Sequence, residues 1–180
     1  EDANFLGRAR VFEAEVFDLA GEVYADEPGF QVQDGSLTLG QNLFLTIHGP
    51  LRVWNGVDAN SFSPSAFLEM SFGPNSITSP LGFGDSGLLT FPVEAAGGLH
   101  DHPDVFFRNA FDGVVIAEFS LSTDAAFAAS ERFWIIWGYN AGEPEIEAAE
   151  EWVEANLVPA PGAVALMGLV GLASARRRRA

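Results

Sequence analysis

The sequence predicts an all-β protein: an antiparallel, jelly-roll-like β-sandwich over residues 1–142, a short amphipathic helix over 143–157 and a hydrophobic sorting tail over 158–180. Three observations predict this fold class. Apolar residues recur at every second position in short runs, as they do in half-buried strands. Glycine, proline, asparagine and aspartate separate these runs. Helical spacing is clear in one segment only, near the end of the chain.

The first predicted strand is residues 10–19, where Phe12 and Val16 take one face and Glu13 and Glu15 the other. Further strands are expected at residues 43–47, 51–54, 67–72, 88–93, 105–108, 114–121 and 133–139. The last of these shows no polar alternation, which predicts a central strand that is buried on both faces. Residues 124–130 fit either one helical turn or a loop.

The composition predicts a single domain with a substantial core. Of the 180 residues, 48% are apolar, and 16 are Phe and 4 are Trp, which is too apolar for a disordered chain. The chain begins at Glu1 rather than Met. Together with the tail described below, this beginning predicts a mature exported protein from which a signal peptide has been removed.

The charge balance excludes several classes of function. The formal net charge is −16, and four of the nine basic residues lie in the last five positions, so that five remain against 25 acidic residues. A body so acidic does not neutralise the phosphates of a nucleic acid, and it does not lie on an anionic leaflet. The absence of cysteine excludes disulfides, thiolate metal sites and cysteine nucleophiles.

Residues 143–157 are expected to form the helix. Pro144 suits a first-turn position, and Glu143 and Glu145 place negative charge at the positive end of the helix dipole. The helical spacing of apolar residues predicts one buried face, formed by Ile146, Ala149, Trp152 or Val153, and Leu157.

Three pieces follow one another at the end of the chain. The linker Val158, Pro159, Ala160, Pro161 and Gly162 ends the helix. Residues 163–175 are apolar or small, and as a helix they would span about 20 Å, less than the bilayer core of about 30 Å. The arginines Arg176, Arg177, Arg178 and Arg179 would stop this segment on the cytoplasmic side. A short anchor with a basic end is typical of a transient membrane segment that is later processed.

This order of linker, short apolar helix and terminal arginine cluster resembles the PEP-CTERM sorting signal, which occurs on exported proteins of Gram-negative bacteria, planctomycetes among them. Pro159, Ala160 and Pro161 take the Pro-Glu-Pro positions of that family, and the chain departs from its pattern at Ala160, where the family has Glu. The resemblance implies a membrane-embedded exosortase-type protease as partner, transient anchoring in the inner membrane and delivery to the cell surface or extracellular matrix.

The segment Gly98-Leu99-His100-Asp101-His102-Pro103-Asp104 is the clearest candidate for chemistry. Alternate residues of a strand share a face, so His100 and His102 are placed to hold one metal ion such as zinc, with Asp101 or Asp104 as an oxygen ligand or as a group that orients a ring. The other reading is an exposed loop whose histidines alternate by chance. His48 is the only other imidazole, and a three-histidine site would have to recruit it.

Other chemistry is weakly indicated. Calcium would take closely spaced carboxylate and amide oxygens, for which Asp58 and Asn60 are a partial match. Gly84-Asp85-Ser86-Gly87 is similar to the nucleophile loop of trypsin-like proteases, but the matching histidine loop is missing. An exposed Trp54 would stack on sugars, although a place in the core is favoured.

These observations predict a non-catalytic exported surface or matrix protein. Two alternatives remain open: a surface metal-binding module that uses His100 and His102, with zinc or calcium as cofactor, and a domain that binds or cleaves exopolysaccharide.

Overall fold

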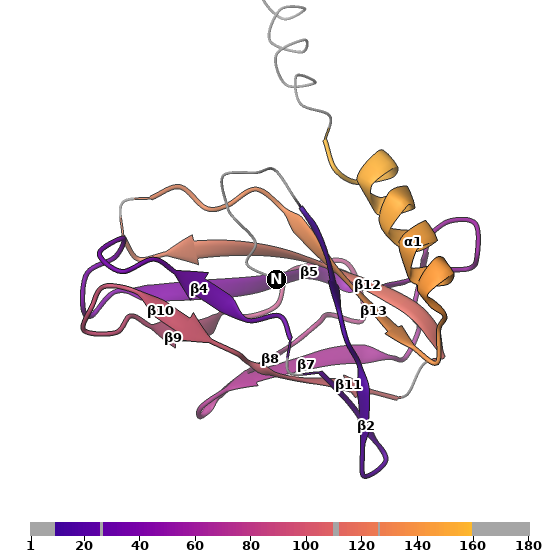
Figure 1. Cartoon of the computed structure of the whole chain (residues 1–180), viewed down its shortest axis with the longest axis horizontal. Helices are drawn as coiled ribbons and strands as arrows, with labels where there is room; N and C mark the ends of the chain where they lie inside the picture. The colour runs from indigo at the N-terminus through magenta and orange to yellow at the C-terminus, as the bar shows by residue number, and fades with distance from the viewer. Residues whose placement is uncertain (1–9, 26, 110–111, 126, 160–180) are drawn as a thin grey trace, which may run out of the picture.

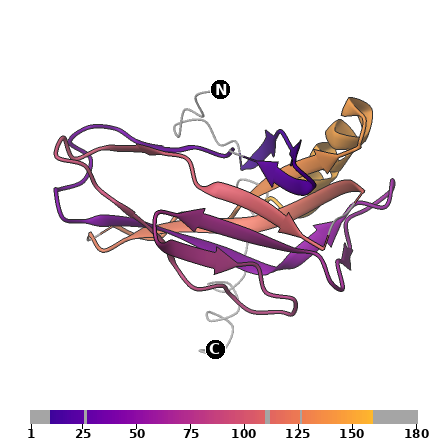
Figure 2. The ribbon, with the colours of Figure 1, turned by 90° about the horizontal axis from the view of Figure 1, so that it is seen from below.

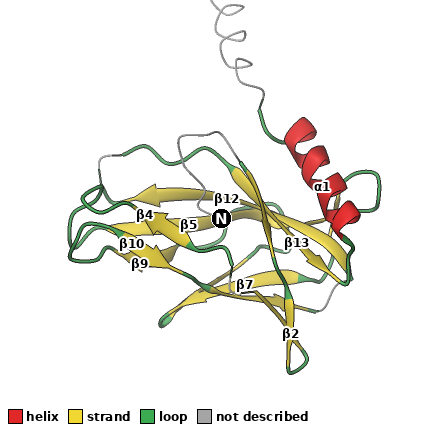
Figure 3. Ribbon diagram, viewed as in Figure 1, coloured by secondary structure: helices red, strands yellow, loops and turns green. Residues whose placement is uncertain are grey.

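A computed structural model describes residues 10–159, except residues 26, 110–111 and 126. In this part of the chain strands predominate and one helix is present (Figure 3), which confirms the predicted all-β class. The strands are β1 (Val11–Ala14), β2 (Phe17–Leu19), β3 (Glu22–Ala25), β4 (Phe30–Val32), β5 (Asn42–Val53), β6 (Ser61–Phe62), β7 (Phe67–Phe72), β8 (Asn75–Thr78), β9 (Leu89–Pro92), β10 (Leu99–Asp101), β11 (Asp104–Arg108), β12 (Gly113–Thr123) and β13 (Phe133–Tyr139). The helix is α1 (Glu143–Asn156).

The larger sheet has six strands in the order β1-β13-β12-β5-β6, with β9 also paired to β5. The long strand β5 makes this possible, because β12 covers one of its edges while β9 and β6 share the other at opposite ends. All pairs are antiparallel except β1 with β13, which is parallel. The predicted antiparallel pairing is therefore wrong at this one edge.

The second sheet has five antiparallel strands in the order β2-β3-β11-β7-β8, and β10 and β4 form a separate two-stranded sheet. The predicted strand 10–19 contributes to both larger sheets. It breaks at residues 15–16, so that β1 pairs with β13 while β2 pairs with β3. The two halves of this predicted strand therefore belong to different sheets.

Both larger sheets contribute to one cluster of buried apolar side chains. Leu45 from β5 and Leu68 from β7 are fully buried in it. Trp137 of β13 contacts the ring of Phe107 of β11 edge-on, with the ring centroids 5.3 Å apart. The five residues from Phe133 to Trp137 are all buried, which confirms the prediction of a central strand buried on both faces.

Helix α1 packs on the other face of the six-stranded sheet, at one end of the molecule (Figures 1 and 2). Ala149 and Val153 are fully buried there, against a second cluster that includes Trp134 and Ile136 of β13. Trp54 is also buried, and its ring lies 6.3 Å from that of Trp152. The predicted helix, its proline in the first turn and its apolar face are thereby confirmed.

Two predicted strands, 43–47 and 51–54, are one strand in the structure. Gly49 makes this continuity possible, since it has a φ of +72° in the middle of β5. The register with β12 shifts between Ile116 and Glu118, opposite this point. Residues 124–130, apart from the undescribed residue 126, lie in neither helix nor strand, which decides for a loop.

Candidate functional site

A cavity of about 200 Å³ opens on the face of the six-stranded sheet that carries α1. The strand period puts Leu45 and Ile47 of β5 in the core, and His48 therefore points to the opposite face. Glu118 of β12 is opposite His48 in the strand register. The lining consists of His48, Gly49, Pro50, Arg52, Phe62, Phe83, Gly84, Asp85, Ile116, Glu118 and Arg132.

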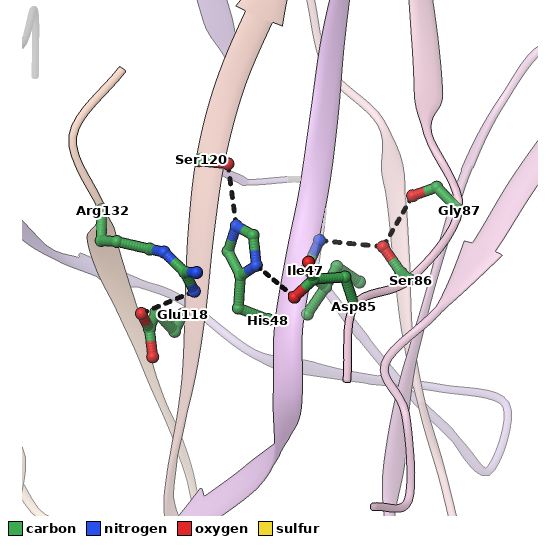
Figure 4. A network of polar contacts seen from close by, with 8 residues as sticks. All are labelled: Ile47, His48, Asp85, Ser86, Gly87, Glu118, Ser120 and Arg132. Atoms are coloured by element: carbon green, nitrogen blue, oxygen red, sulfur yellow. Dashed lines mark hydrogen bonds and ion pairs between the residues drawn. The ribbon is translucent and has the colours of Figure 1, made fainter. Parts of the chain in front are cut away.

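His48 is held by both of its ring nitrogens (Figure 4). Nδ1 lies 2.6 Å from Oδ1 of Asp85, and Nε2 lies 2.8 Å from Oγ of Ser120. An ionised carboxylate only accepts hydrogen bonds, so Nδ1 carries a proton and, in the neutral ring, Nε2 accepts from the Ser120 hydroxyl. The pKa of Asp85 is lowered, first by this hydrogen bond and then by the charges of His48 and Arg132.

Backbone hydrogen bonds fix the loop that carries Asp85 to β5. Gly49 N donates to Gly84 O at 2.7 Å, and Ser86 N donates to Ile47 O at 2.9 Å. The Ser86 hydroxyl accepts from Ile47 N and donates to Gly87 O (Figure 4). In the Gly84–Gly87 motif, Ser86 therefore holds the loop in place while Asp85 orients the imidazole.

Aromatic rings form one side of the cavity. Phe83 is 88% exposed, more than any other large apolar side chain of the described residues. Its ring meets the edge of Phe62, with the centroids 5.3 Å apart, and the guanidinium of Arg52 lies 4.8 Å from the Phe62 centroid. Arg132, which also lines the cavity, donates to Glu118 at 2.8 Å (Figure 4). The cavity thus combines an exposed ring with charged and hydrogen-bonding groups.

Ser120, His48 and Asp85 have the hydrogen-bond order of a serine hydrolase triad, but their surroundings lack other features of that site. Ser120 lies within β12 and does not line the cavity. In an α/β-hydrolase the N–H of the residue after the nucleophile helps to stabilise the oxyanion. Here Leu121 N donates to Ser130 Oγ at 2.8 Å and is already used. The chain of hydrogen bonds from Ser120 through His48 to Asp85 fixes the orientation of the imidazole.

The predicted histidine pair lies elsewhere, on β10 and just after it. Nε2 of His100 is 3.1 Å from Nε2 of His102, so the structure brings these two residues together. Nδ1 of His102 lies 3.6 Å from Oε1 of Glu27. The imidazole of His102 also packs on Gly29, where a Cβ would lie 2.6 Å from its Cε1 atom.

The remaining predicted ligands have other contacts. Asp104 accepts a hydrogen bond from the Tyr24 hydroxyl at 3.2 Å, and His48 belongs to the cavity described above. Asp58 accepts from Asn60 N at 2.9 Å within a turn. Across the described residues, no group of three or more His, Asp or Glu is placed to hold one metal ion.

Of the predicted sorting signal, Val158 and Pro159 are described, and Val158 packs against the cluster under α1. Ala160, Pro161, Gly162 and the four arginines Arg176, Arg177, Arg178 and Arg179 lie outside the described residues, as does the apolar segment 163–175. In residues 10–159, with the gaps given above, no helix is long and apolar enough to cross a membrane.

Sequence reasoning named His48 and the loop at residues 84–87 but did not connect them, and it missed the aromatic side of the cavity. A second cavity of about 520 Å³ lies beside the same loop. Its lining, residues 76–78, 80 and 85–87, contains no aromatic ring and no charged residue except Asp85. Comparison with known proteins adds no relative: no protein-family model and no curated protein matches the chain.

Proposed function

We propose that the protein is an exported, non-catalytic surface or matrix protein that is delivered through its C-terminal signal. The order of residues 158–180 supports this proposal: a proline linker, a short apolar segment and a basic end. An exosortase-type protease in the inner membrane would be its processing partner. Intact-mass measurement of the surface-exposed protein tests this, because processing predicts a chain that ends between Pro159 and Gly162. A surface form that retains Arg179 would overturn it.

We also propose that the two larger sheets pack face to face as a jelly-roll-like β-sandwich. The shared core cluster and the contact between Phe107 and Trp137 support this arrangement. Two sheets that bury their inner faces on each other leave their outer faces for other uses. In the six-stranded sheet the outer face would carry both α1 and the cavity at His48.

For the body itself we propose saccharide binding at this cavity, and the observation that carries the proposal is the exposed ring of Phe83 beside it. Stacking on an aromatic face suits the apolar face of a sugar ring, while the carboxylates of Glu118 and Asp85 offer acceptor oxygens for hydroxyl groups. A cavity of about 200 Å³ is smaller than sites for drug-sized ligands. Its size suits a single ring of a longer glycan.

Glycan-array screening of the full chain, followed by calorimetric titration of the glycans that bind, tests this function. Phe83→Ala should weaken binding at least tenfold. Phe127→Ala should not weaken it, because Phe127 is also exposed, at 63%, but does not line the cavity. Equal losses in both variants, or no binding to any glycan of the array, would overturn the proposal.

A second candidate function, metal binding at the histidine pair, is favoured by the separation of the two Nε2 atoms. Two nitrogens bound to one tetrahedral zinc at about 2.0–2.1 Å lie roughly 3.3 Å apart, close to the 3.1 Å observed. Glu27 beside Nδ1 of His102 would orient that ring from outside the metal shell.

Thermal unfolding of the full chain with EDTA, zinc and calcium in turn tests the metal site, because a ligand of the folded state raises the midpoint. We expect a rise with zinc that is lost in the double variant His100→Ala/His102→Ala. A rise with calcium that survives this double variant would place a site on the acidic loops instead. No shift with any metal would overturn metal binding.

A further inference from the structure

Arg52 differs from the other arginines of the described residues in its charge partners. Arg10 pairs with Glu131, Arg108 with Glu22 and Glu69, and Arg132 with Glu118. Within the described part of the chain, no carboxylate forms an ion pair with Arg52. This is unexpected in a protein with 25 acidic residues and a net charge of −16.

The side chain of Arg52 is nevertheless held in a defined place. Its guanidinium lies over the ring of Phe62, 4.8 Å from the centroid, and its Nη1 donates to Ala59 O at 3.1 Å. A guanidinium has five N–H donors in a planar fork, so donors remain for a further acceptor. Arg52 lines the same cavity as Phe83.

The shift in the pKa of Arg52 also indicates that its positive charge lacks an adequate negative partner. Burial lowers the pKa of Arg52, and the charge of Glu118 opposes this effect only in part. The carboxylate of Glu118 is itself paired with Arg132. Burial makes the charged form of Arg52 less favourable, and within the described residues no ion pair compensates for this. An anion bound in the cavity would supply that compensation.

We propose that the cavity selects an acidic sugar, a uronate residue of a polysaccharide, whose carboxylate pairs with Arg52 while its ring stacks on Phe83. This inference rests on the proposed saccharide binding and names its ligand class. A planar carboxylate matches the fork of a guanidinium in two parallel hydrogen bonds. It is also the smallest anionic group of sugars, which suits a cavity of about 200 Å³ that must hold the ring as well.

Because the protein is acidic, its overall charge does not attract an acidic glycan, and the attraction comes from the contact with Arg52 alone. A surface of net charge −16 repels a polyanionic chain at long range, and salt screens that repulsion. The contact at Arg52 is partly buried and is screened less. Binding of an acidic glycan should therefore change little, or strengthen, when the ionic strength rises from about 0.01 to 0.15 M. Non-specific binding to a basic patch would weaken over the same range.

Calorimetric titration of the full chain tests the inference, with oligosaccharides of galacturonate, mannuronate and glucuronate as probes. Each probe is compared with its carboxyl-reduced form, which keeps the linkage and loses the charge. A polyoxyethylene detergent keeps the apolar tail in solution, because an alkyl glycoside would compete for the cavity. We expect at least one uronate to bind tenfold or more tightly than its reduced form.

Arg52→Gln should remove this preference while leaving the affinity for the reduced form within about twofold. Arg108→Gln is the matched control, because it removes the same charge at a residue that does not line the cavity and should keep the preference. Phe83→Ala should weaken both forms alike. Circular dichroism and the unfolding midpoint of each variant establish that it is folded.

The outcomes separate the inference from the function on which it rests. Equal binding of acidic and reduced forms, or a preference that survives Arg52→Gln, would overturn uronate selection and leave saccharide binding in place. Preference for a sulfated galactan over every uronate would also overturn it. No binding of any probe, acidic or neutral, would overturn both proposals.

Discussion

Oδ1 of Asp85 lies 2.6 Å from Nδ1 of His48, although the two residues are 37 positions apart in the sequence. The bond joins the loop after β8 to the middle of β5, at the point where His48 and Asp85 also form an isolated β-bridge. It orients the imidazole toward Ser120 and places Phe83, two residues before Asp85, on the side of the cavity.

Asp85→Ala should destabilise the folded protein at neutral pH and much less in acid. The native pKa of Asp85 is lowered, so the unfolded chain binds a proton more readily than the folded chain. The stabilisation is therefore complete above the ordinary Asp pKa of about 3.9 and is lost as the pH falls through the native value. Urea unfolding at about pH 7 and about pH 3 measures this difference.

Glu15→Ala serves as the control for this experiment, because Glu15 is an exposed carboxylate between β1 and β2. It should leave the free energy of unfolding nearly unchanged at both pH values. If Asp85→Ala were equally destabilising at the two pH values, the hydrogen bond to His48 would not be the source of the effect.

Gly138→Ala should loosen the packing of α1 on the sheet. A Cβ at residue 138 would lie 2.5 Å from Cδ1 and 2.9 Å from Cγ1 of Ile146. Overpacking of this kind typically costs about 1–3 kcal/mol, and urea unfolding measures it. The double variant Gly138→Ala/Ile146→Ala removes the clash, so the second substitution should cost less in the Gly138→Ala background than in the natural chain. Additive effects of the two substitutions would show that the contact is relaxed by other means.

The sequence predicts α1 and the strands β12 and β13 well, because each carries a strong local signal. Ile146, Ala149 and Val153 have helical spacing, and their burial against β13 agrees with it. The strand at residues 133–139 was predicted with its ends as observed. For these elements the apolar pattern along the chain and the packing of the fold favour the same structure.

The strands missed by sequence reasoning are short, and two of them are defined by long-range pairing. β4 (Phe30–Val32) and β10 (Leu99–Asp101) have three residues each and exist through their pairing with one another. The break of the predicted strand 10–19 has the same origin, because β1 and β2 find their partners in different sheets. Alternation of apolar residues does not carry information about the partner strand.

The two candidate sites show the same difference between local sequence signals and long-range contacts. The histidine pair was found because His100 and His102 are two residues apart, whereas the cavity joins residues of β5, β6 and β12 with loops. No local motif connects Arg52 to Phe83, since their proximity follows from the pairing of β5 with β6 and from the loop fixed by Asp85.

Trp137→Ala should be among the most destabilising substitutions in the chain. Trp137 is fully buried and contacts Phe107 of the other sheet as well as Phe119 of its own. Truncation of a buried tryptophan costs about 3–5 kcal/mol, measured by urea unfolding. Trp152→Ala, at the half-buried edge of α1, should cost clearly less. Equal losses in the two variants would contradict the central place of Trp137 in the shared core.

Trp137→Phe separates packing from hydrogen bonding at the same position. Within the described residues, the buried Nε1 of Trp137 has no hydrogen-bond partner. Trp137→Phe leaves a smaller cavity than Trp137→Ala does. It also removes an unpaired donor, whose burial typically costs about 1–3 kcal/mol. The net loss of unfolding free energy should be well below that of Trp137→Ala.

Glu150→Gln should stabilise the protein at neutral pH. Burial raises the pKa of Glu150, and the nearby carboxylates of Glu154, Glu13 and Glu147 raise it further. The folded chain therefore binds the proton of Glu150 more tightly than the unfolded chain does. The stabilisation from Glu150 is complete below the ordinary Glu pKa of about 4.3, and it is lost as the pH rises through the native value. Relief of one like-charge pair on a helix stabilises by about 0.2–0.5 kcal/mol.

Asp124→Asn should change the free energy of unfolding at neutral pH in the opposite direction. Hydrogen bonds from the backbone N–H and the side-chain amide of Asn42 lower the pKa of Asp124, so its stabilisation is present at neutral pH and is lost in acid. Urea unfolding at about pH 7 should therefore show Glu150→Gln as more stable and Asp124→Asn as less stable than the natural chain. Both differences should shrink at about pH 3, where the carboxylates become protonated. A gain from Glu150→Gln that persists in acid would mean that the repulsion among the α1 carboxylates is not its cause.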